Sequence, residues 1–410
     1  MMNHLKNIGS IAFTAMGMLF ATAAAAQAPA SAPVYHIYAG NTHAHTIFSM
    51  SHGAQYIHKP GYKHYMRTDS AGVSVSINTV LRPDWYKRQG LPSAHYALAR
   101  ANGYDFYITT DHSQEAGFHP TSPISAAWLA TGHAASVATD SGFVAIRGFE
   151  YSENNGPGAK GHINVINTAT YLNALESGID IPYLYRWLDT VSANGDGPVV
   201  ASFNHPGARQ YDDWNYRDGK ITDIITMLEV INSDTHIHYQ GFINALDKGW
   251  KVSPVCGNDN HGLSGITRQR SRTFVLAGAR TKTAILDGMK NRRTYASLES
   301  NIHCSYTVNG HIMGSTLSGG ESFQFDIRIS DPDTGDPNDK ITRIDIVKDG
   351  GEVVKTYRPD PAYLVSWRPV IRDSRNKYFF IRVWNAGGGD GPRADPEKPV
   401  AWLAPVWTGR

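Results

Sequence analysis

The length, composition and charge of the chain already exclude several classes of protein. With 410 residues it exceeds the roughly 250–300 residues at which a single hydrophobic core stops growing, so we expect two domains. Hydrophobic residues make up 41% and charged residues 18%, as in an ordinary globular protein rather than a disordered one. The formal net charge is only +2 and both signs are interspersed, so no nucleic-acid-binding face is expected. Eighteen histidines are the one unusual count.

The first 26 residues have the pattern of a signal peptide. Lys6 supplies a positive charge, residues 8–20 are mostly apolar, and the alanine-rich run 21–26 offers a cleavage site before Gln27. The alternative, a membrane anchor, needs about 20 continuous apolar residues, and this run is shorter. No later stretch is long and apolar enough to span a bilayer. We therefore expect an exported protein, periplasmic or secreted, that keeps no membrane segment.

Residues 34–302 alternate between short apolar strands and helix-like stretches. The predicted helices are 92–102, with Ser93 as a candidate N-cap, and 182–191, whose apolar residues recur at helical spacing. Alternation of this kind favours a largely parallel sheet, open or closed into a barrel. The predicted strands are 105–109, 143–148, 199–204, 227–231 and 252–256.

The long segment between Ser49 and Pro92 is irregular and rich in Gly, Ser, His and Tyr. Structureless stretches of this length inside a domain usually serve as lids or binding loops. Its aromatic residues would either line a substrate pocket or pack the lid: Tyr56, Tyr62, Tyr65, Trp85 and Tyr86.

After residue 302 the pattern changes to period-two alternation separated by Asn-Gly and Gly-Gly turns. The predicted strands are 303–308, 323–329, 341–348 and 378–384, and they indicate an antiparallel β-sandwich over residues 303–410. The two cysteines, Cys256 and Cys304, would either pair or remain buried thiols, and their spacing argues against a cysteine zinc site.

Histidines and carboxylates recur where a predicted strand gives way to a loop. In a β/α barrel such positions converge on one face, which is where barrel enzymes place their active sites. Imidazole and carboxylate together favour Zn²⁺, Mn²⁺ or Fe²⁺, and a carboxylate can bridge two ions. The absence of a G-x-S-x-G motif and of a phosphate-binding glycine loop argues against a serine hydrolase or a kinase. The residues concerned are His43, His45, Asp111, His112, Glu150, His162, His205, Asp259 and His261.

In this order the motifs resemble those of the PHP (polymerase and histidinol phosphatase) family of metallohydrolases. The chain has H-x-H-T-x-x-S at 43–49, T-D-H at 110–112, N-H-P at 204–206 and G-x-D-x-H at 257–261, with Glu150 and His162 between them. The resemblance covers residues 34–302. The tract 292–297 (R-R-T-Y-A-S) and the V-N-G at 308–310 resemble an exported branch with an added β-domain, which includes carbaryl hydrolase-type enzymes.

The resemblance implies a distorted β/α barrel with an appended C-terminal β-sandwich, and it implies a set of metal ligands. His43, His45, Glu150 and Asp259 would hold one divalent transition metal (Zn, Mn or Fe). Glu150, as a bridge, would hold a second metal together with His162 and His205. His112 and His261 would belong to a third position.

The chain departs from the family pattern at Met50, where many members have an acidic ligand for the third metal. We therefore predict two ions and a doubtful third, with His112 and His261 left as catalytic residues that bind substrate or donate a proton. His52 is a less favoured substitute ligand. Asp111 would either coordinate directly or, as we favour, orient a histidine ligand and so assist catalysis.

Substrate contacts are assigned to Asn204 and to an arginine-rich stretch, although a solvated basic loop would explain the stretch equally well. Of Arg268, Arg270 and Arg272 we favour the first and last, since arginine suits an anionic oxygen. The predicted activity is hydrolysis of a small organic phosphomono- or diester by metal-bound hydroxide. The alternatives are a carbamate or carboxyl ester hydrolase on the same metals, and a non-catalytic protein that binds metal or ligand. Neither the exact substrate nor an oligomeric state follows from the residues.

Overall fold

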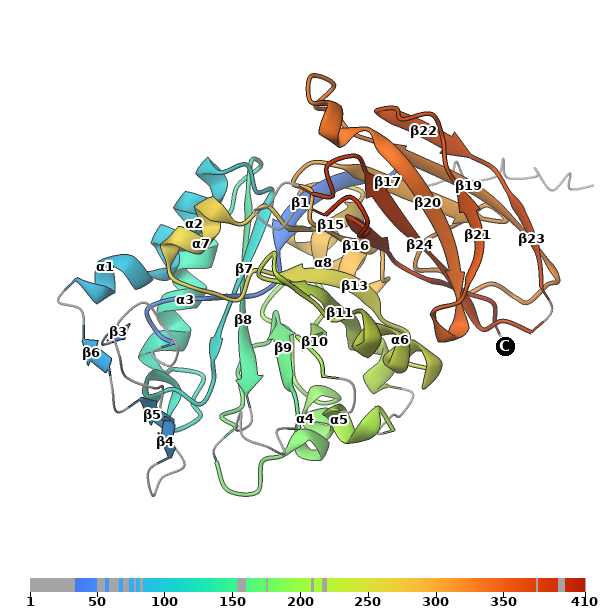
Figure 1. The fold of residues 1–410 in the computed structure, drawn as a ribbon. Helices are drawn as coiled ribbons and strands as arrows, with labels where there is room; N and C mark the ends of the chain where they lie inside the picture. Colours follow the sequence, from blue (N-terminus) through green and yellow to red (C-terminus); the bar gives the residue numbers. More distant parts are fainter. Residues whose placement is uncertain are drawn as a thin grey trace, which may run out of the picture. The chain divides into compact units, whose positions relative to one another are not determined.

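The first part of the fold is a barrel of mostly parallel strands wrapped by helices (Figure 1). The structure is a computed structural model that describes residues 34–49, 56–58, 66–68, 74–76, 79–81, 84–152, 160–174, 176–207, 210–215, 220–373, 375–389 and 395–409. The barrel strands are β1 (His36–Asn41), β7 (Phe106–His112), β8 (Val144–Ser152), β9 (His162–Ile166), β10 (Val200–Asn204), β11 (Ile225–Asn232), β13 (Ser253–Gly257), β15 (Arg272–Ala277) and β16 (Thr294–Ser297).

Parallel pairing joins β1 to β7, β7 to β8, β10 to β11 and β11 to β13. Three strands break the pattern: β9 runs antiparallel between β8 and β10, and β15 lies antiparallel to both β1 and β16. All five strands predicted for this region are present, extended or shifted by a few residues. The reversal of β9 matters for the site, because its first residue lies at the edge where β8 and β10 end.

Threonine side chains join β13 to the strands on its other side. Thr273 of β15 donates to the carbonyl of Cys256 at 2.8 Å and accepts from its N–H at 2.7 Å. Thr294 of β16 donates to the Pro254 carbonyl at 3.0 Å. These bonds close the barrel where no backbone ladder joins the described strands, and they satisfy backbone groups that would otherwise be buried and unpaired.

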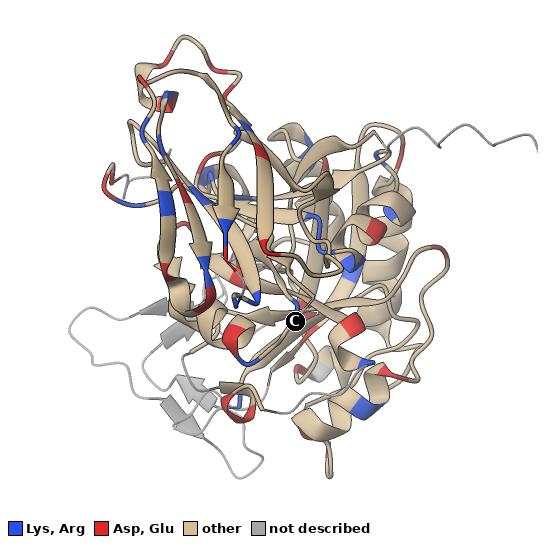
Figure 2. Cartoon of the chain, turned by 90° about the vertical axis from the view of Figure 1, so that its right-hand side faces the viewer, with Lys and Arg blue, Asp and Glu red and all other residues tan. Residues whose placement is uncertain are grey.

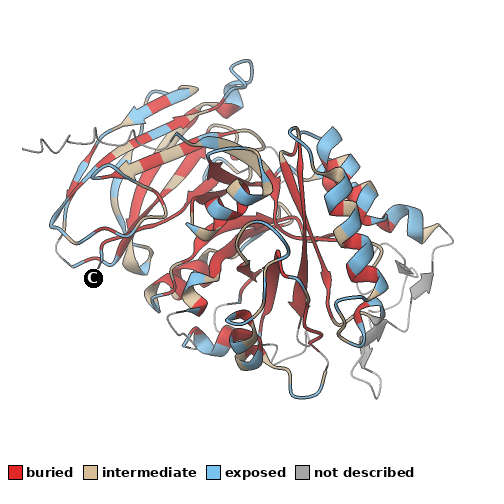
Figure 3. Ribbon diagram, turned by 180° about the vertical axis from the view of Figure 1, so that it is seen from behind, coloured by how far each residue is buried: buried red, intermediate tan, exposed pale blue. Residues whose placement is uncertain are grey.

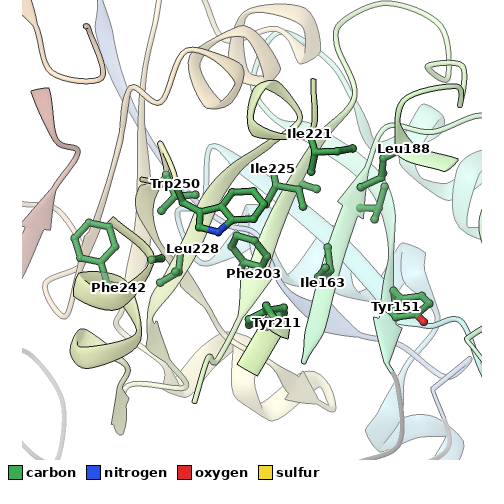
Figure 4. Close-up of a cluster of buried hydrophobic side chains, with 14 of the residues drawn as sticks. Tyr151, Ile163, Leu188, Phe203, Tyr211, Ile221, Ile225, Leu228, Phe242 and Trp250 are labelled. Carbon is green, nitrogen blue, oxygen red and sulfur yellow. The ribbon is translucent and has the colours of Figure 1, made fainter. Parts of the chain in front are cut away.

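Helices cover the barrel, and most barrel strands are buried along their length (Figure 3). Inside it, apolar side chains such as Ile108, Ile146 and Val255 cluster with Leu286 of α8. Outside, Phe203, Tyr211 and Trp250 anchor a second, aromatic cluster (Figure 4). The helices are α1 (Trp85–Gln89), α2 (Pro92–Ala101), α3 (Ala126–Ala138), α4 (Ile181–Leu188), the short α5 (Gln210–Asp213), α6 (Tyr239–Asp247), α7 (Leu263–Arg268) and α8 (Lys282–Lys290).

The C-terminal strands form two antiparallel layers around a shared apolar core. One layer contains β17 (His303–Val308), β18 (His311–Ile312), β19 (Ser322–Ser330), β22 (Leu364–Trp367) and β23 (Val370–Arg372). The other contains β20 (Ile341–Lys348), β21 (Val353–Tyr357), β24 (Tyr378–Asn385), β25 (Ala401–Leu403) and β26 (Val406–Trp407). Acidic and basic residues are interspersed on these strands (Figure 2). The predicted fold class, an α/β barrel with an added antiparallel β-sandwich, is confirmed.

The second of these layers continues the barrel sheet, because β25 pairs with β16. Residues Tyr35–Arg410 accordingly form one compact unit by their contacts. The predicted division at residues 302 and 303 coincides with the start of β17 and stays a prediction. Cys256 and Cys304 are both buried free thiols.

The predicted cap of α2 is wrong. The N-cap residue is Leu91, which makes no side-chain cap bond, and Ser93 is the second residue of the helix. Pro92 takes the first helical position, where its missing N–H costs no hydrogen bond. Within the described part of the chain, no helix is long and apolar enough to cross a membrane. The predicted signal peptide lies outside the described residues.

Candidate metal centre

The predicted ligands gather at the edge of the barrel where the parallel strands end. Glu150 lies on β8, two residues before its last, and His205 directly follows β10. His162 opens β9, whose antiparallel course brings that residue to the same edge. His45 ends the short strand β2 (Ala44–His45), which pairs in parallel with β14 (Asn260–His261) and so brings together the histidine-rich segments of both strands.

Glu150 is at the middle of the cluster, and its two oxygens face different histidines. Oε1 lies 3.2 Å from His162 Nδ1 and 3.4 Å from His205 Nε2. Oε2 lies 3.0 Å from His112 Nε2 and 3.7 Å from His45 Nε2. A carboxylate in this position can bridge two ions.

The remaining ligands surround His43, whose side chain is completely buried. Its Nε2 is 3.0 Å from His45 Nε2, 3.4 Å from Glu150 Oε1 and 3.5 Å from Asp259 Oδ1. The donor atoms form four overlapping groups, each within 4.8 Å, and together they include all six predicted metal ligands. The groups are His43, His45 and Glu150; His43, His205 and Asp259; Glu150, His162 and His205; and His45, His112 and His261.

This donor set fits divalent transition metals. It consists of imidazole nitrogens and carboxylate oxygens, which suit Zn²⁺, Mn²⁺ and Fe²⁺, and most of the donors are buried. The group of His45, His112 and His261, which corresponds to the predicted third metal position, consists of histidines alone. Met50 and His52 lie outside the described residues.

The charges of the centre are strongly coupled. Burial alone would raise the pKa of Glu150, but His43 and His162 hold it well below its usual range. Burial likewise opposes ionisation of Asp259, and His43 and His45 keep its pKa low. For His45, burial and the neighbouring His261 and His112 lower the pKa. The carboxylates are therefore ionised, as metal ligands must be.

A carboxylate that the sequence analysis missed holds His43 from behind. Glu229 of β11 is fully buried, and its Oε1 lies 2.7 Å from His43 Nδ1. Its Oε2 accepts the backbone N–H of His205 at 2.8 Å. A carboxylate on the far nitrogen of a histidine ligand fixes the tautomer and the ring orientation. The available signal was a lone glutamate within an apolar strand, since a buried charge needs a partner.

Asp111 lies behind the first histidine pair. It accepts hydrogen bonds from Thr46 N–H at 2.6 Å and from Ser49 Oγ at 2.9 Å, and Ser49 Oγ is 3.1 Å from His45 Nδ1. Burial raises the pKa of Asp111 to about 6, although these hydrogen bonds oppose the rise. Asp111 thus reaches His45 through Ser49 and belongs to none of the four donor groups.

His112 also has an acidic neighbour that the sequence analysis missed. Its Nδ1 lies 3.5 Å from Glu115 Oε1, on the side away from Glu150. His261 stacks on His45, with ring centroids 4.1 Å apart. The two predicted catalytic histidines therefore lie together on one side of Glu150.

The residues assigned to substrate lie in different environments. Asn204 is buried, and its side-chain amide donates to Glu150 Oε1 at 2.9 Å. Arg272 is buried with its guanidinium 3.6 Å from the centroid of the Tyr104 ring, and it donates to the carbonyls of Gln269 and Ser271. Arg268 ends α7 and is exposed. Substrate contact by these three residues stays a prediction.

The aromatic loop is described only in part. Trp85 and Tyr86 begin α1, half-buried and exposed respectively. Tyr62 and Tyr65 lie outside the described residues, as does the side chain of Tyr56, whose backbone belongs to β3 (Tyr56–His58).

Comparison with known proteins gives distant structural likeness only. No family model and no curated protein matches the chain. Among solved structures, it is similar to a two-domain Bacteroides vulgatus protein containing a predicted PHP-like metal-dependent phosphoesterase, with 16% identity, a TM-score of 0.45, and 90% of this chain and 95% of that one covered. It is also similar to the lesion-specific endonuclease EndoQ of Pyrococcus furiosus, with 13% identity, a TM-score of 0.33, and 75% and 62% covered. Neither likeness is close enough to carry an argument about activity.

Proposed function

We propose that the protein is a metal-dependent hydrolase of small organic phosphomono- or diesters. The observation that carries the proposal is the position of Glu150 between two groups of histidines, each group contacted by a different carboxylate oxygen. A site that only sequestered a single ion would not need a carboxylate shared by overlapping donor groups.

His43, His45, Glu150 and Asp259 would hold one ion, and Glu150, His162 and His205 the other. Two such ions supply Lewis acidity, a water of lowered pKa, and charge neutralisation of the attacking and leaving oxygens. Zn²⁺, Mn²⁺ and Fe²⁺ all suit these donors.

Side chains around the centre would hold the metal ligands in position and supply a proton. Glu229 and Asp111, through Ser49, fix the rings of His43 and His45. His112 and His261 lie on the side of Glu150 away from His162 and would face the substrate. As the water oxygen bonds to phosphorus and the bond to the ester oxygen breaks, one of these histidines gives its proton to the leaving oxygen.

The test is a panel of nitrophenyl esters assayed during titration with Zn²⁺ or Mn²⁺: a phosphomonoester, a phosphodiester, a carboxyl ester and a carbamate. We expect metal-dependent release of phosphate or nitrophenol from the phosphoesters, and none from Glu150→Gln purified in the same way. Cleavage of only the carboxyl ester or carbamate would replace the proposal by its alternative. Tight metal uptake without turnover would indicate a binding protein.

We also propose that the protein is exported and meets its small-molecule substrate outside the cytoplasm. Support comes from Lys6, the apolar run 8–20 and the alanines before Gln27. N-terminal sequencing of the protein from a periplasmic fraction should begin at Gln27. Full-length protein confined to the cytoplasm would contradict export.

A further inference from the structure

A cavity of about 560 Å³ lies beside α3 and β8 and is separate from the candidate metal centre. Arg147 of β8 lines it, three residues before Glu150. Side chains an odd number of residues apart on a strand point to opposite faces, so Arg147 points away from the metal ligands. None of the predicted metal ligands and no residue of the four donor groups is among the residues that line this cavity.

Arg147 is a buried cation that has no acidic partner in the part of the chain that the structure describes. It is 8% exposed, its guanidinium lies 3.6 Å from the centroid of the Trp128 ring, and it donates to the carbonyls of Trp128 and Thr168. Its Nε has no hydrogen-bond partner among the described residues, and no described carboxylate acts on its charge. Such a charge is costly to bury unless something compensates it.

A second cation faces the same cavity. Lys282, the first residue of α8, lines it and donates from Nζ to the Asn194 carbonyl at 2.6 Å. Burial and the charge of Arg147 both lower the pKa of Lys282, so the two cations repel each other across the cavity. Asp196 only partly opposes this lowering of the pKa.

The other lining residues supply hydrogen-bonding and apolar surface. Asn167 is almost fully buried, and its Oδ1 has no hydrogen-bond partner among the described residues. Leu129, Ala135 and Ile146 add apolar surface, and no Asp or Glu is among the described lining residues. The volume falls within the roughly 300–1,000 Å³ typical of small-molecule sites and exceeds the needs of a bare ion.

We infer that this cavity binds a small organic anion, with its phosphate or carboxylate group between Arg147 and Lys282 and its less polar part against Leu129. An anionic group there compensates both cations through charge-assisted hydrogen bonds. The inference does not rest on the proposed hydrolase activity.

The test counts binding sites on the metal-loaded protein by equilibrium dialysis with labelled inorganic phosphate, glycerol phosphate and acetate. Arg147→Met keeps an unbranched chain over Trp128 but removes the charge, and Lys282→Gln removes the other charge at the start of α8. We expect each variant to weaken one site by about tenfold or more for the anion that the wild type prefers. Comparing the affinities for glycerol phosphate and acetate shows whether the cavity prefers a phosphate or a carboxylate group.

Lys290→Gln is the matched control, because Lys290 ends the same helix but does not line the cavity. It should bind as the wild type does. Phosphate held at the metal centre is recognised by its loss in His205→Asn, which leaves the cavity intact. Unchanged site numbers and affinities in both Arg147→Met and Lys282→Gln, or equal weakening in Lys290→Gln, would overturn the inference.

Discussion

At the scale of single residues, the carboxylates of the centre divide into those that face the donor cluster and those that stand behind it. Glu150 and Asp259 belong to the donor groups, whereas Glu229 and Asp111 act on His43 and His45 from the far side. The two roles differ in what a neutral replacement removes. Loss of a facing carboxylate removes a ligand, whereas loss of one behind only loosens a ring.

Glu150→Gln should therefore lose metal and activity more completely than Asp111→Asn. The amide that replaces the Glu150 carboxylate would carry no charge to offset two ions, while Asp111→Asn should weaken metal affinity by about 10–100-fold. Metal content per chain, measured by elemental analysis after dialysis, distinguishes the two. Equal metal loss in both variants would show that Asp111 is itself a ligand.

Glu229→Gln should weaken metal binding by about 10–100-fold while leaving the protein folded, because the amide oxygen can still accept from His43 but without charge. Competition with a chromophoric chelator measures the affinity, and circular dichroism checks the fold. Glu176→Gln, on a half-buried residue between β9 and α4 that accepts a hydrogen bond from the Thr121 N–H, is a control expected to match the wild type. If Glu229→Gln bound metal with wild-type affinity, Glu229 would have no role in holding His43 for metal binding.

At the scale of elements, the end of strand β13 must leave room for the buried side chain of Glu229. Gly257 ends β13, and a Cβ there would lie 1.9 Å from Glu229 Oε1 and 2.8 Å from His43 Cβ. Neither Glu229 nor His43 can move away from this Cβ without disturbing the hydrogen bond between the two side chains. The glycine is therefore required by the close approach of β13 to β11 and to the loop after β1.

Gly257→Ala should destabilise the protein by about 1–3 kcal/mol, as overpacking does, and should also weaken metal binding. Denaturant unfolding of the metal-free protein and metal titration measure the two effects. Gly278→Ala is the control, since nothing lies within 4 Å of a Cβ at that position. Normal metal binding by Gly257→Ala would show that Glu229 and His43 can move to accept a Cβ at this position without loss of the metal site.

Helix α2 carries a buried histidine that predicts a pH dependence. Burial lowers the pKa of His95 from its usual 6.5 to about 4, although its hydrogen bond to the Gln89 carbonyl opposes the shift. As pH falls below 6.5 the unfolded chain takes up this proton before the folded one, so the free energy of unfolding decreases. The loss is complete near pH 4 and amounts to about 3 kcal/mol.

His95→Gln keeps a donor for Gln89 and should abolish that contribution. The measurement is the free energy of unfolding from pH 4 to 7 for wild type and variant, whose difference cancels the titration of the metal centre. The exposed His36→Gln should retain the wild-type slope. An identical slope in His95→Gln would mean that folding does not lower the pKa of His95.

At the scale of the whole molecule, the metal centre links segments that are distant in the sequence. Donor residues from β2, β8, β9, β10 and β13 or their adjoining loops meet only when the barrel is formed, so we expect the proposed ions to bind the folded state. Binding to the folded state alone stabilises it, by about 2.7 kcal/mol at a free metal concentration 100 times Kd.

Chelation should therefore lower the unfolding temperature as well as abolish activity, and the metal-loaded protein should contain close to two ions per chain. His112→Asn or His261→Asn should lower turnover while two ions remain bound. Anomalous scattering from a metal-loaded crystal decides the count. A well-occupied third peak among His45, His112 and His261 would show that these histidines hold an ion despite Met50.

Local signals in the sequence determined the alternation of strands and helices, the sandwich strands after residue 302, and the histidines and carboxylates that meet in the donor cluster. The end of each strand can be predicted from the residues around it. In a mostly parallel barrel the carboxyl ends of the strands lie on one face, so residues predicted at these ends are also predicted to lie near one another. Asp111-His112 and Glu150, for example, follow or end apolar runs that became β7 and β8.

Long-range contacts decided the rest. Glu229 meets His43 across 186 positions of the sequence, and no local pattern reveals which buried acid faces which histidine. The reversal of β9, the threonine bonds that close the barrel at β13, and the stacking of Arg272 on Tyr104 likewise depend on how strands pair. Nothing in the sequence distinguishes Arg147 from other arginines in strands. Only the packed structure shows that it stacks on Trp128 and shares a cavity with Lys282. Residue types and periodicity specify elements and chemistry, but only the packed structure specifies which side chains share a buried space.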